Sequence, residues 1–246
     1  IPRDRQTLLF SATLEGRVLK IADQLLKRPQ SIALVTNHDR HRSIRQHMHH
    51  ADSKAHKHKL LAHHLENGQL TKTLIFTSTK RGADQLAKTL RSMDHKSAAL
   101  HGDMSQNKRR QTVENLRKGR VEMLVATDVA ARGLDIKDIS HVINFDLPMV
   151  AEDYIHRIGR TGRAGATGCA ISLVGSADWQ KLSQIEKLTG RKINREVIEG
   201  LEPTSSEPKI EHGAKTNPKF KRKFGGISKG KGRQKPGHWR KDSSGA

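Results

Sequence analysis

Residues 73–126 read TLIFTSTKRGADQLAKTLRSMDHKSAALHGDMSQNKRRQTVENLRKGRVEMLVA, and their apolar positions follow two alternating periods. Short apolar runs of strand length alternate with longer patterns of helical period. The runs lie at 73–76, 97–100 and 122–126, and the helical patterns at 81–91 and 106–116. A strand, a helix and a second strand form the crossover unit of a parallel sheet. The stretch therefore predicts an α/β fold, a parallel sheet with helices on both faces.

The same alternation continues on both sides of this stretch. Further strand-like runs lie at 7–10, 31–35, 141–145 and 169–174, and helical patterns at 15–26, 54–65, 150–158 and 177–188. Residues 36–53 interrupt it with a polar run, which we interpret as a linker leading into the next domain. Ligands of parallel sheets bind at the carboxyl ends of the strands. We therefore expect the site in the loops after Phe76, Leu100, Ala126 and Phe145.

Composition excludes several classes of protein. No apolar stretch approaches the roughly 18 residues of a membrane span, so the chain is not expected to be an integral membrane protein. The single cysteine, Cys169, cannot form an internal disulfide, which indicates a reducing compartment and a core position. The chain begins at Ile1 without a signal-peptide pattern, and we expect a fragment of a longer protein. Its 46 Lys and Arg against 25 Asp and Glu, a net charge of +21, favour polyanionic partners.

Much of this charge lies in residues 203–246. They contain twelve Lys and Arg against three acids, seven of the 20 glycines and four of the seven prolines. Such a composition buries too little to offset the entropy of ordering, so it predicts a disordered basic tail. Phe220, Phe224 and Trp239 lie among the cations and can stack on unpaired bases. A merely solubilising tail is the alternative.

Two stretches carry groups suited to phosphates and sugars. HRIGRTGRAG at 156–165 places Arg157, Arg160 and Arg163 three residues apart, with glycines that allow close approach. Arginine binds phosphate oxygens bidentately and can neutralise charge during phosphoryl transfer; a surface ion-pair face is the alternative. In LVATDVAARGLDI at 124–136, Thr127 can donate to a phosphate and Asp135 can accept from a sugar hydroxyl.

These stretches resemble a known family, the DEAD-box RNA helicases of superfamily 2. HRIGRTGRAG matches its HRxGRxGRxG signature, and ATDVAARGLD its ATDVAARGxD signature. SAT at 11–13, LIF at 74–76 and HGDM at 101–104 follow the family's order, and the resemblance covers roughly residues 6–200. QTLLFSATLEG at 6–16 is among short stretches similar to the bacterial SrmB type; the related RhlE type shares the core motifs.

The resemblance implies a domain organisation and an activity. Residues 1–35 would be the C-terminal fragment of a first RecA-like domain, 36–53 the linker and 54–202 the complete second RecA-like domain. The activity implied is ATP-dependent local unwinding of RNA by a monomer in the bacterial cytoplasm. The implied substrate is ribosomal RNA or its precursor, in ribosome assembly, with ribosomal proteins as further partners.

The resemblance also assigns roles to residues. The catalytic residues implied are Arg160, Arg163 and His156; Asp135, Arg160 and Arg163 would bind ATP. Those implied to contact the RNA backbone are Thr79, Lys80, Gly102, Asp103, Thr127 and Arg132. Ser11, Thr13 and His156 would couple the two domains. Arg109 is expected to support the motifs at Phe76 and Gly159, and Gln106 to begin a helix.

Two motifs of an ATP-hydrolysing member are absent from the chain. There is no Gly-x-x-x-x-Gly-Lys-[Ser/Thr] loop, because the near match at 225–232 ends in glycine, and no Asp-Glu-Ala-Asp. We expect these motifs, with the Mg²⁺ ligands, in a missing N-terminal half, and no ATPase activity of this chain alone. A non-catalytic RNA-binding module and a DNA-directed superfamily 2 helicase are the alternatives.

Nine of the 15 histidines lie within residues 38–64, including His47, His49 and His50. No cysteine is near, and the spacing matches no familiar zinc pattern. We therefore predict a solvated linker and helix face and no metal site. Trp179 is expected to pack in the core.

Overall fold

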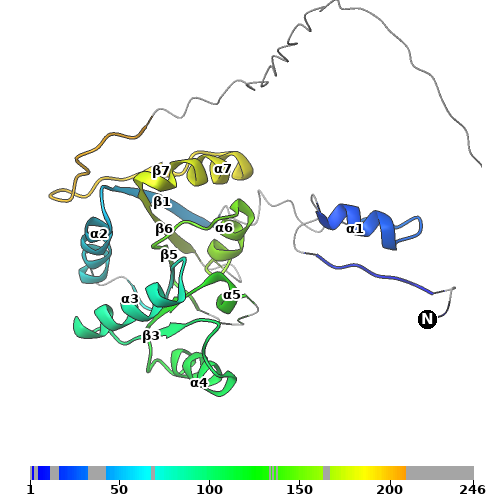
Figure 1. The fold of residues 1–246 in the computed structure, drawn as a ribbon, viewed down its shortest axis with the longest axis horizontal. Helices are drawn as coiled ribbons and strands as arrows, with labels where there is room; N and C mark the ends of the chain where they lie inside the picture. The colour runs from blue at the N-terminus through cyan, green and yellow to red at the C-terminus, as the bar shows by residue number, and fades with distance from the viewer. Residues whose placement is uncertain are drawn as a thin grey trace, which may run out of the picture. The chain divides into compact units, whose positions relative to one another are not determined.

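The computed structural model describes residues 2, 5–11, 17–32, 43–67, 70–132, 134, 136, 138–162 and 167–208. From residue 43 onward they form a seven-stranded sheet in the order β3-β4-β2-β5-β6-β1-β7, in which all paired strands run parallel (Figure 1). The strands are β1 (Ile44–Ala51), β2 (Thr73–Phe76), β3 (Ser97–Leu100), β4 (Met123–Ala126), β5 (His141–Asn144), β6 (Gly168–Gly175) and β7 (Asn194–Arg195).

Helices cover both faces of this sheet, as the sequence predicts. They are α2 (Lys54–Glu66), α3 (Lys80–Ser92), α4 (Gln106–Arg117), α5 (Asp128–Ala131), α6 (Ala151–Ile158) and α7 (Trp179–Thr189), with a 3-10 turn at Ser176–Asp178. Alternate strand residues point to opposite faces. Ile75 therefore packs with α2 and α3, whereas Leu74 and Phe76 pack with α4 and α5. Met48 and Ala170 face α6 and α7.

Hydroxyl side chains fix the starts of three of these helices. Oγ of Ser53 accepts from the backbone N–H of His56, Thr79 from Gly82 and Ser105 from Lys108, so each satisfies a donor that the first turn leaves open. Gln106 therefore begins α4, as predicted. Cys169 and Trp179 are buried, at 6% and 4% exposure, which confirms their core positions.

The prediction of a linker over residues 36–53 is wrong for Ile44–Ala51, which form β1. This strand pairs with β6 along its whole length and lies one strand from the sheet edge. Its sequence, IRQHMHHA, looks polar, yet His47 and His49 are only 5% and 2% exposed. A neutral imidazole can be buried, as His49 is with both nitrogens hydrogen-bonded, so a count of polar residues underestimates this strand.

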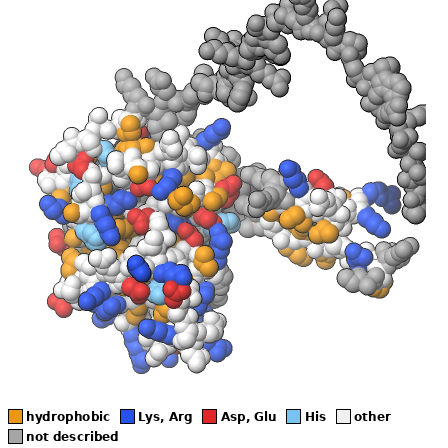
Figure 2. Space-filling view, viewed as in Figure 1, with side chains coloured by type: hydrophobic (Ala, Val, Ile, Leu, Met, Phe, Trp, Pro, Cys, Tyr) orange, Lys and Arg blue, Asp and Glu red, His pale blue; other side chains and the backbone are white. Residues whose placement is uncertain are grey.

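The predicted strands at 7–10 and 31–35 are not found among the described residues. Residues 5–11 and 31–32 have no strand structure, and 33–35 lie outside the described part of the chain. A strand exists only through hydrogen bonds to a neighbour, and the described residues provide none there. The predicted helix is present as α1 (Arg17–Leu25), over which Figure 2 shows hydrophobic side chains at the surface. No helix in the described ranges is long and apolar enough to cross a membrane.

The prediction of a disordered tail is wrong for its first residues, 203–208. Asp52 accepts hydrogen bonds from the backbone N–H groups of Thr204 and Ser205, at 2.7 and 3.1 Å. These bonds and that from the Ser205 hydroxyl hold the pKa of Asp52 far below its usual range. Residues 203–208 are thus attached to the domain. Residues 209–246, including Phe220, Phe224 and Trp239, lie outside the described part.

We predict that Gly168→Ala destabilises the domain by about 1–3 kcal/mol, the usual cost of an extra methyl group in a packed site. A Cβ atom at Gly168 would lie 2.6 Å from the backbone nitrogen of Gly162 and 2.7 Å from the Thr161 side chain. Urea denaturation measures the loss. Gly102→Ala is the matched control, because nothing lies within 4 Å of a Cβ atom there; equal stability of the two variants would contradict the prediction.

Candidate functional site

Three adjacent strands end at one level, and most of the candidate RNA-binding residues follow directly after them. Leu100, Ala126 and Phe76 end β3, β4 and β2 and lie side by side in register. The ladder continues one residue further, since Thr77 N–H donates to the Ala126 carbonyl and Thr127 N–H to that of Leu100. The following loops therefore leave the same edge of the sheet, as parallel strands require.

We call Thr79, Lys80, Gly102, Asp103 and Thr127 the carboxyl-edge set. Lys80 forms an ion pair with Asp103 from the neighbouring loop. Its hydrogen bond lowers the pKa of Asp103. Gly102 is exposed, and Thr127, at 9% exposure, is the residue from which α5 begins. The structure thus brings together a hydroxyl, an ammonium and exposed backbone, groups suited to a sugar-phosphate chain.

Arg132 lies at the other end of α5. Its Nη2 donates to Oδ1 of Asp153 on α6 at 2.6 Å, which raises the pKa of the guanidinium. The side chain is 61% exposed. Arg132 therefore keeps a surface position next to α6, where further N–H donors of the fork can reach a ligand.

Arg157, by contrast, is 2% exposed and fully engaged inside the domain. Its Nε and Nη2 donate to the two carboxylate oxygens of Asp128, at 2.6 and 2.8 Å. Its Nη1 donates to Asn144 Oδ1 and to the Asp146 carbonyl, and the guanidinium lies 4.7 Å from the centre of the Phe76 ring. The interpretation of three equivalent phosphate-binding arginines is therefore wrong for Arg157, which joins α6 to α5, β5 and β2.

Arg160 lies at the opposite ends of the strands, the amino ends, beside the residues that precede β5. Its Nη1 donates to the carbonyl of Leu134 at 3.0 Å, and its Nε to that of His156 at 3.3 Å. The next residue, Thr161, donates through Oγ1 to the carbonyl of Ile139, just before β5 begins. The predicted site residue Arg160 therefore does not follow the carboxyl end of a strand, because α6 runs back across the sheet before residue 160.

Of the other predicted site residues, two lie within the described part of the chain and three lie outside it. His156 is half-buried in the last turn of α6, and Ser11 is exposed. Asp135, Arg163 and Thr13 lie outside the described residues. Leu134 precedes Asp135, so Arg160 is bonded to the residue next to the predicted ribose contact.

Arg109 contacts a helix that the sequence did not predict. Its Nη2 donates to the carbonyl of Ala130 at 2.6 Å, which ties it to α5. The four-residue helix α5 gave no periodic signal in the sequence, which is why this partner was not foreseen.

Residues 55–165 match the helicase conserved C-terminal domain family. The chain is 45% identical over 206 residues to the ATP-dependent RNA helicase SrmB of Haemophilus influenzae, covering 83% of this chain and 47% of that protein. Its structure resembles the E. coli DEAD-box protein SrmB, crystallised with regulator of ribonuclease activity A, with a TM-score of 0.65 and 42% identity over 67% of this chain and 97% of the other.

The chain belongs to the DEAD-box family. Saccharomyces cerevisiae Dbp5 bound to RNA and ADP BeF3 is a further structural neighbour, with a TM-score of 0.71 and 35% identity over 80% of this chain and 52% of Dbp5. The sheet is accordingly the RecA-like helicase C-terminal domain. The chain spans about half the length of the curated relatives it matches.

Several supports of this DEAD-box domain were missed in the sequence. His101, 9% exposed, contacts Asp84 on α3 through Nε2 at 3.0 Å, which holds the loop of Gly102 against α3. Asp146 Oδ2 accepts from the Ser78 N–H at 2.9 Å and so fixes the loop before Lys80. Sequence spacing gives no signal for such pairs, because the partners are 17 and 68 residues apart.

We predict that Arg157→Lys lowers the free energy of unfolding of this DEAD-box domain by about 3 kcal/mol, near the lower limit for breaking a buried ion pair. Lysine keeps the charge but cannot make the bidentate contact with Asp128. Urea denaturation measures the change. Arg132→Lys is the control, since this exposed pair with Asp153 is worth under about 1 kcal/mol; a similar loss in both variants would contradict the role of Arg157.

Proposed function

We propose that this chain is the C-terminal half of an ATP-dependent RNA helicase, which couples ATP binding and hydrolysis to local unwinding of RNA. The observation that carries the proposal is the buried Arg157 network. It ties α5, which follows the carboxyl-edge set, to α6, which leads into His156 and Arg160. The Arg157–Asp128 pair therefore connects the carboxyl ends of the strands, where we place RNA, to Arg160 at their amino ends.

Arg160 is the proposed nucleotide contact. Its guanidinium, held by two backbone carbonyls, suits the γ-phosphate of ATP and can offset negative charge during hydrolysis. We assign the same role to Arg163 and the ribose contact to Asp135. ATP supplies the phosphoryl group whose transfer to water drives the cycle. Because the chain has no phosphate loop, the remaining phosphate contacts and the Mg²⁺ ligands belong to the preceding part of the whole protein.

The carboxyl-edge set is the proposed RNA contact, together with Arg132. Hydroxyls, ammonium and backbone N–H groups bind phosphates and sugars without reading sequence. His156, with Ser11 and Thr13, would relate the two domains when ATP and RNA are both bound. Binding energy then separates the strands: a base-pair step costs about 1.4 kcal/mol, so a short duplex is within reach of one closure.

The first residues fit a fragment of the first RecA-like domain. Phe10 is 89% exposed, Ile32 70% and Leu8 66%, although such side chains are normally buried in a sheet. We assign 1–35 to that domain and 54–202, now with β1, to the second. Residues 209–246 would tether RNA non-specifically through charge.

The SrmB-type stretches extend the proposal to the substrate. We propose that the whole protein acts as a monomer on ribosomal RNA or its precursor, during ribosome assembly in the bacterial cytoplasm, where it meets ribosomal proteins.

Arg160→Ala in the full-length protein is expected to reduce RNA-stimulated ATP hydrolysis by about 10³-fold, the lower end for an arginine that stabilises phosphoryl transfer. The measurement is phosphate release at saturating ATP and RNA. Exposed Arg120, which is not among the proposed ATP or RNA contacts, provides the control Arg120→Ala. The 246-residue chain alone should release no phosphate. Unchanged turnover of Arg160→Ala would contradict the assignment.

Lys80→Ala in the full-length protein is expected to weaken binding of single-stranded RNA for all sequences and to reduce the dependence of log K on log salt by about 0.7, the value for one phosphate of a single strand. Fluorescence anisotropy over a salt series measures it. Lys118→Ala is the matched control, because Lys118 is also a surface lysine paired with an acid, Glu114. An identical salt slope for both variants would exclude Lys80 from the RNA contact.

The two alternatives predict different outcomes. A non-catalytic RNA-binding module would bind RNA but show no RNA-stimulated ATP hydrolysis in the full-length protein. A DNA-directed helicase would bind single-stranded DNA at least as tightly as RNA of equal length. The carboxyl-edge set favours RNA through its match to the motifs of the RNA branch.

A further inference from the structure

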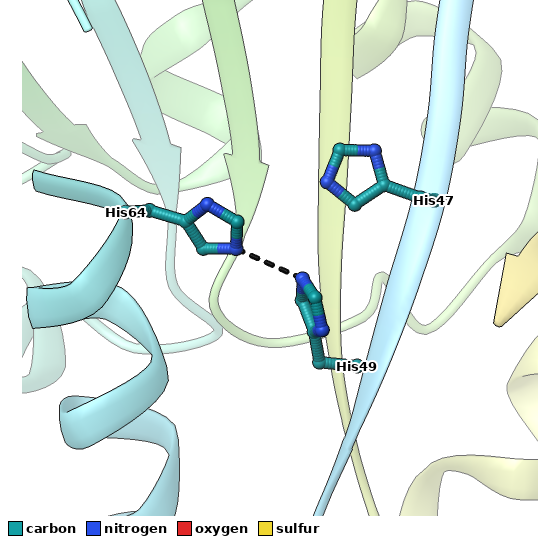
Figure 3. Close-up of side chains that lie close together, drawn as sticks. All are labelled: His47, His49 and His64. Atoms are coloured by element: carbon teal, nitrogen blue, oxygen red, sulfur yellow. Dashed lines mark hydrogen bonds between the residues drawn. The ribbon is translucent and has the colours of Figure 1, made fainter. Parts of the chain in front are cut away.

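Three histidines from two elements meet on the face of the sheet that α2 covers. His47 and His49 are two residues apart on β1 and therefore point to the same face, and His64 lies on α2 (Figure 3). One ring nitrogen of each lies within 4.8 Å of the others. None of these residues belongs to the motifs proposed to bind ATP or RNA.

The hydrogen bonds of His49 determine its tautomer. Its Nδ1 lies 2.8 Å from the backbone carbonyl of Glu196, which can only accept, so Nδ1 carries the proton. The lone pair of the neutral ring is then on Nε2, which lies 2.8 Å from Nε2 of His64 (Figure 3). An imidazole that donates one N–H to a carbonyl and offers the other nitrogen inward has the arrangement typical of a metal ligand.

His47 provides an independent observation. It is 95% buried, being 5% exposed, yet neither ring nitrogen has a hydrogen-bond partner among the described residues. Buried polar atoms of native proteins are nearly always paired, with protein, water or an ion. In Figure 3 the ring of His47 presents one nitrogen to the space between His49 and His64. An ion there would use the lone pair that the protein leaves open.

We propose that His47, His49 and His64 bind one Zn²⁺ ion. Imidazole nitrogen is a preferred ligand of zinc, and zinc sites with three histidines occur with a fourth position open to water or a carboxylate. Glu196 is the carboxylate at hand, since its Oε2 lies 3.7 Å from Nε2 of His47. The linear sequence does not indicate this group, because its members lie on a strand and a helix whose packing no linear spacing expresses.

The ring nitrogens must rearrange to hold the ion, because they lie within 4.8 Å of one another and the most distant pair would close by up to about 1.5 Å. Zinc–nitrogen bonds of 2.0–2.1 Å at tetrahedral angles place two ligand atoms about 3.3 Å apart. The Nε2 atoms of His49 and His64 would therefore separate by about 0.5 Å from their 2.8 Å contact. His64 is half-buried near the end of α2, so its side chain has room to turn.

The burial of the three rings agrees with a neutral state, from which His64 becomes a ligand when its proton moves from Nε2, which donates to Nε2 of His49, to Nδ1. Desolvation lowers the pKa of His47 to about 4 and that of His64 to about 3, and it also lowers the pKa of His49. The bound ion would link β1, the penultimate strand of the sheet, to α2. Its role is thus structural, separate from the ATP and RNA contacts.

The test is titration of the untagged 246-residue chain with Zn²⁺, followed by isothermal calorimetry and thermal unfolding. We expect one equivalent to bind and to raise the unfolding temperature, because a ligand that binds only the folded state stabilises it. His64→Gln should weaken this binding at least about 10-fold, the minimum seen even for outer residues of metal sites. Circular dichroism checks that the variant is folded.

His58→Gln is the matched control, since His58 is another half-buried histidine of α2 but packs on Phe145 and not on the group. It should bind Zn²⁺ like the unaltered chain. X-ray absorption of the zinc complex of the unaltered chain, which requires no variant to fold, should count three imidazole ligands. Absence of binding, equal binding by His64→Gln, equal loss in His58→Gln, or a zinc ion with fewer than three imidazoles would overturn the proposal.

Discussion

The buried guanidinium of Arg157 is the interaction on which the rest of the domain depends. A charge at 2% exposure is costly unless its donors are paired. Asp128 provides a bidentate carboxylate, Asn144 and Asp146 provide oxygens, and Phe76 provides an aromatic face. Asp128, Asn144 and Phe76 lie on α5, β5 and β2, and Asp146 lies two residues beyond β5. Their positions are therefore set together, and none can shift without leaving part of a buried charge unpaired.

This constraint relates two surfaces that lie at opposite ends of the strands. Thr127 and Asp128 are adjacent, so the end of β4 is fixed by the same bonds that hold α6. α6 then carries the chain back to Arg160 and to the start of β5. A change at one end thus has a short, packed route to the other, which is the physical basis we propose for coupling RNA to ATP. The visible face of the domain mixes acids and bases (Figure 2), so placement, not bulk charge, distinguishes the site.

The histidines of β1 illustrate a second principle. Polarity predicted a solvated linker, but β1 pairs with β6 along its whole length and with β7 at His47 and Met48. That pairing forces His47 and His49 into the interior, where His49 finds a carbonyl and His64 while His47 finds no hydrogen-bond partner among the described residues. Sheet register, and not side-chain preference, therefore created the group that we propose to bind zinc.

The sequence by itself determined the α/β fold, most of the helices, the family and the carboxyl-edge set, because these depend on local periodicity, on motif residues close in the chain and on the shared edge of parallel strands. Only the tertiary structure decided that β1 exists, that Arg157 is a buried support and that Arg160 lies at the amino ends of the strands. It alone also joined His64 to β1 and Arg109 to α5. Each of these depends on contacts between residues 11 or more positions apart, determined by how helices pack on a sheet, which no spacing along the chain encodes.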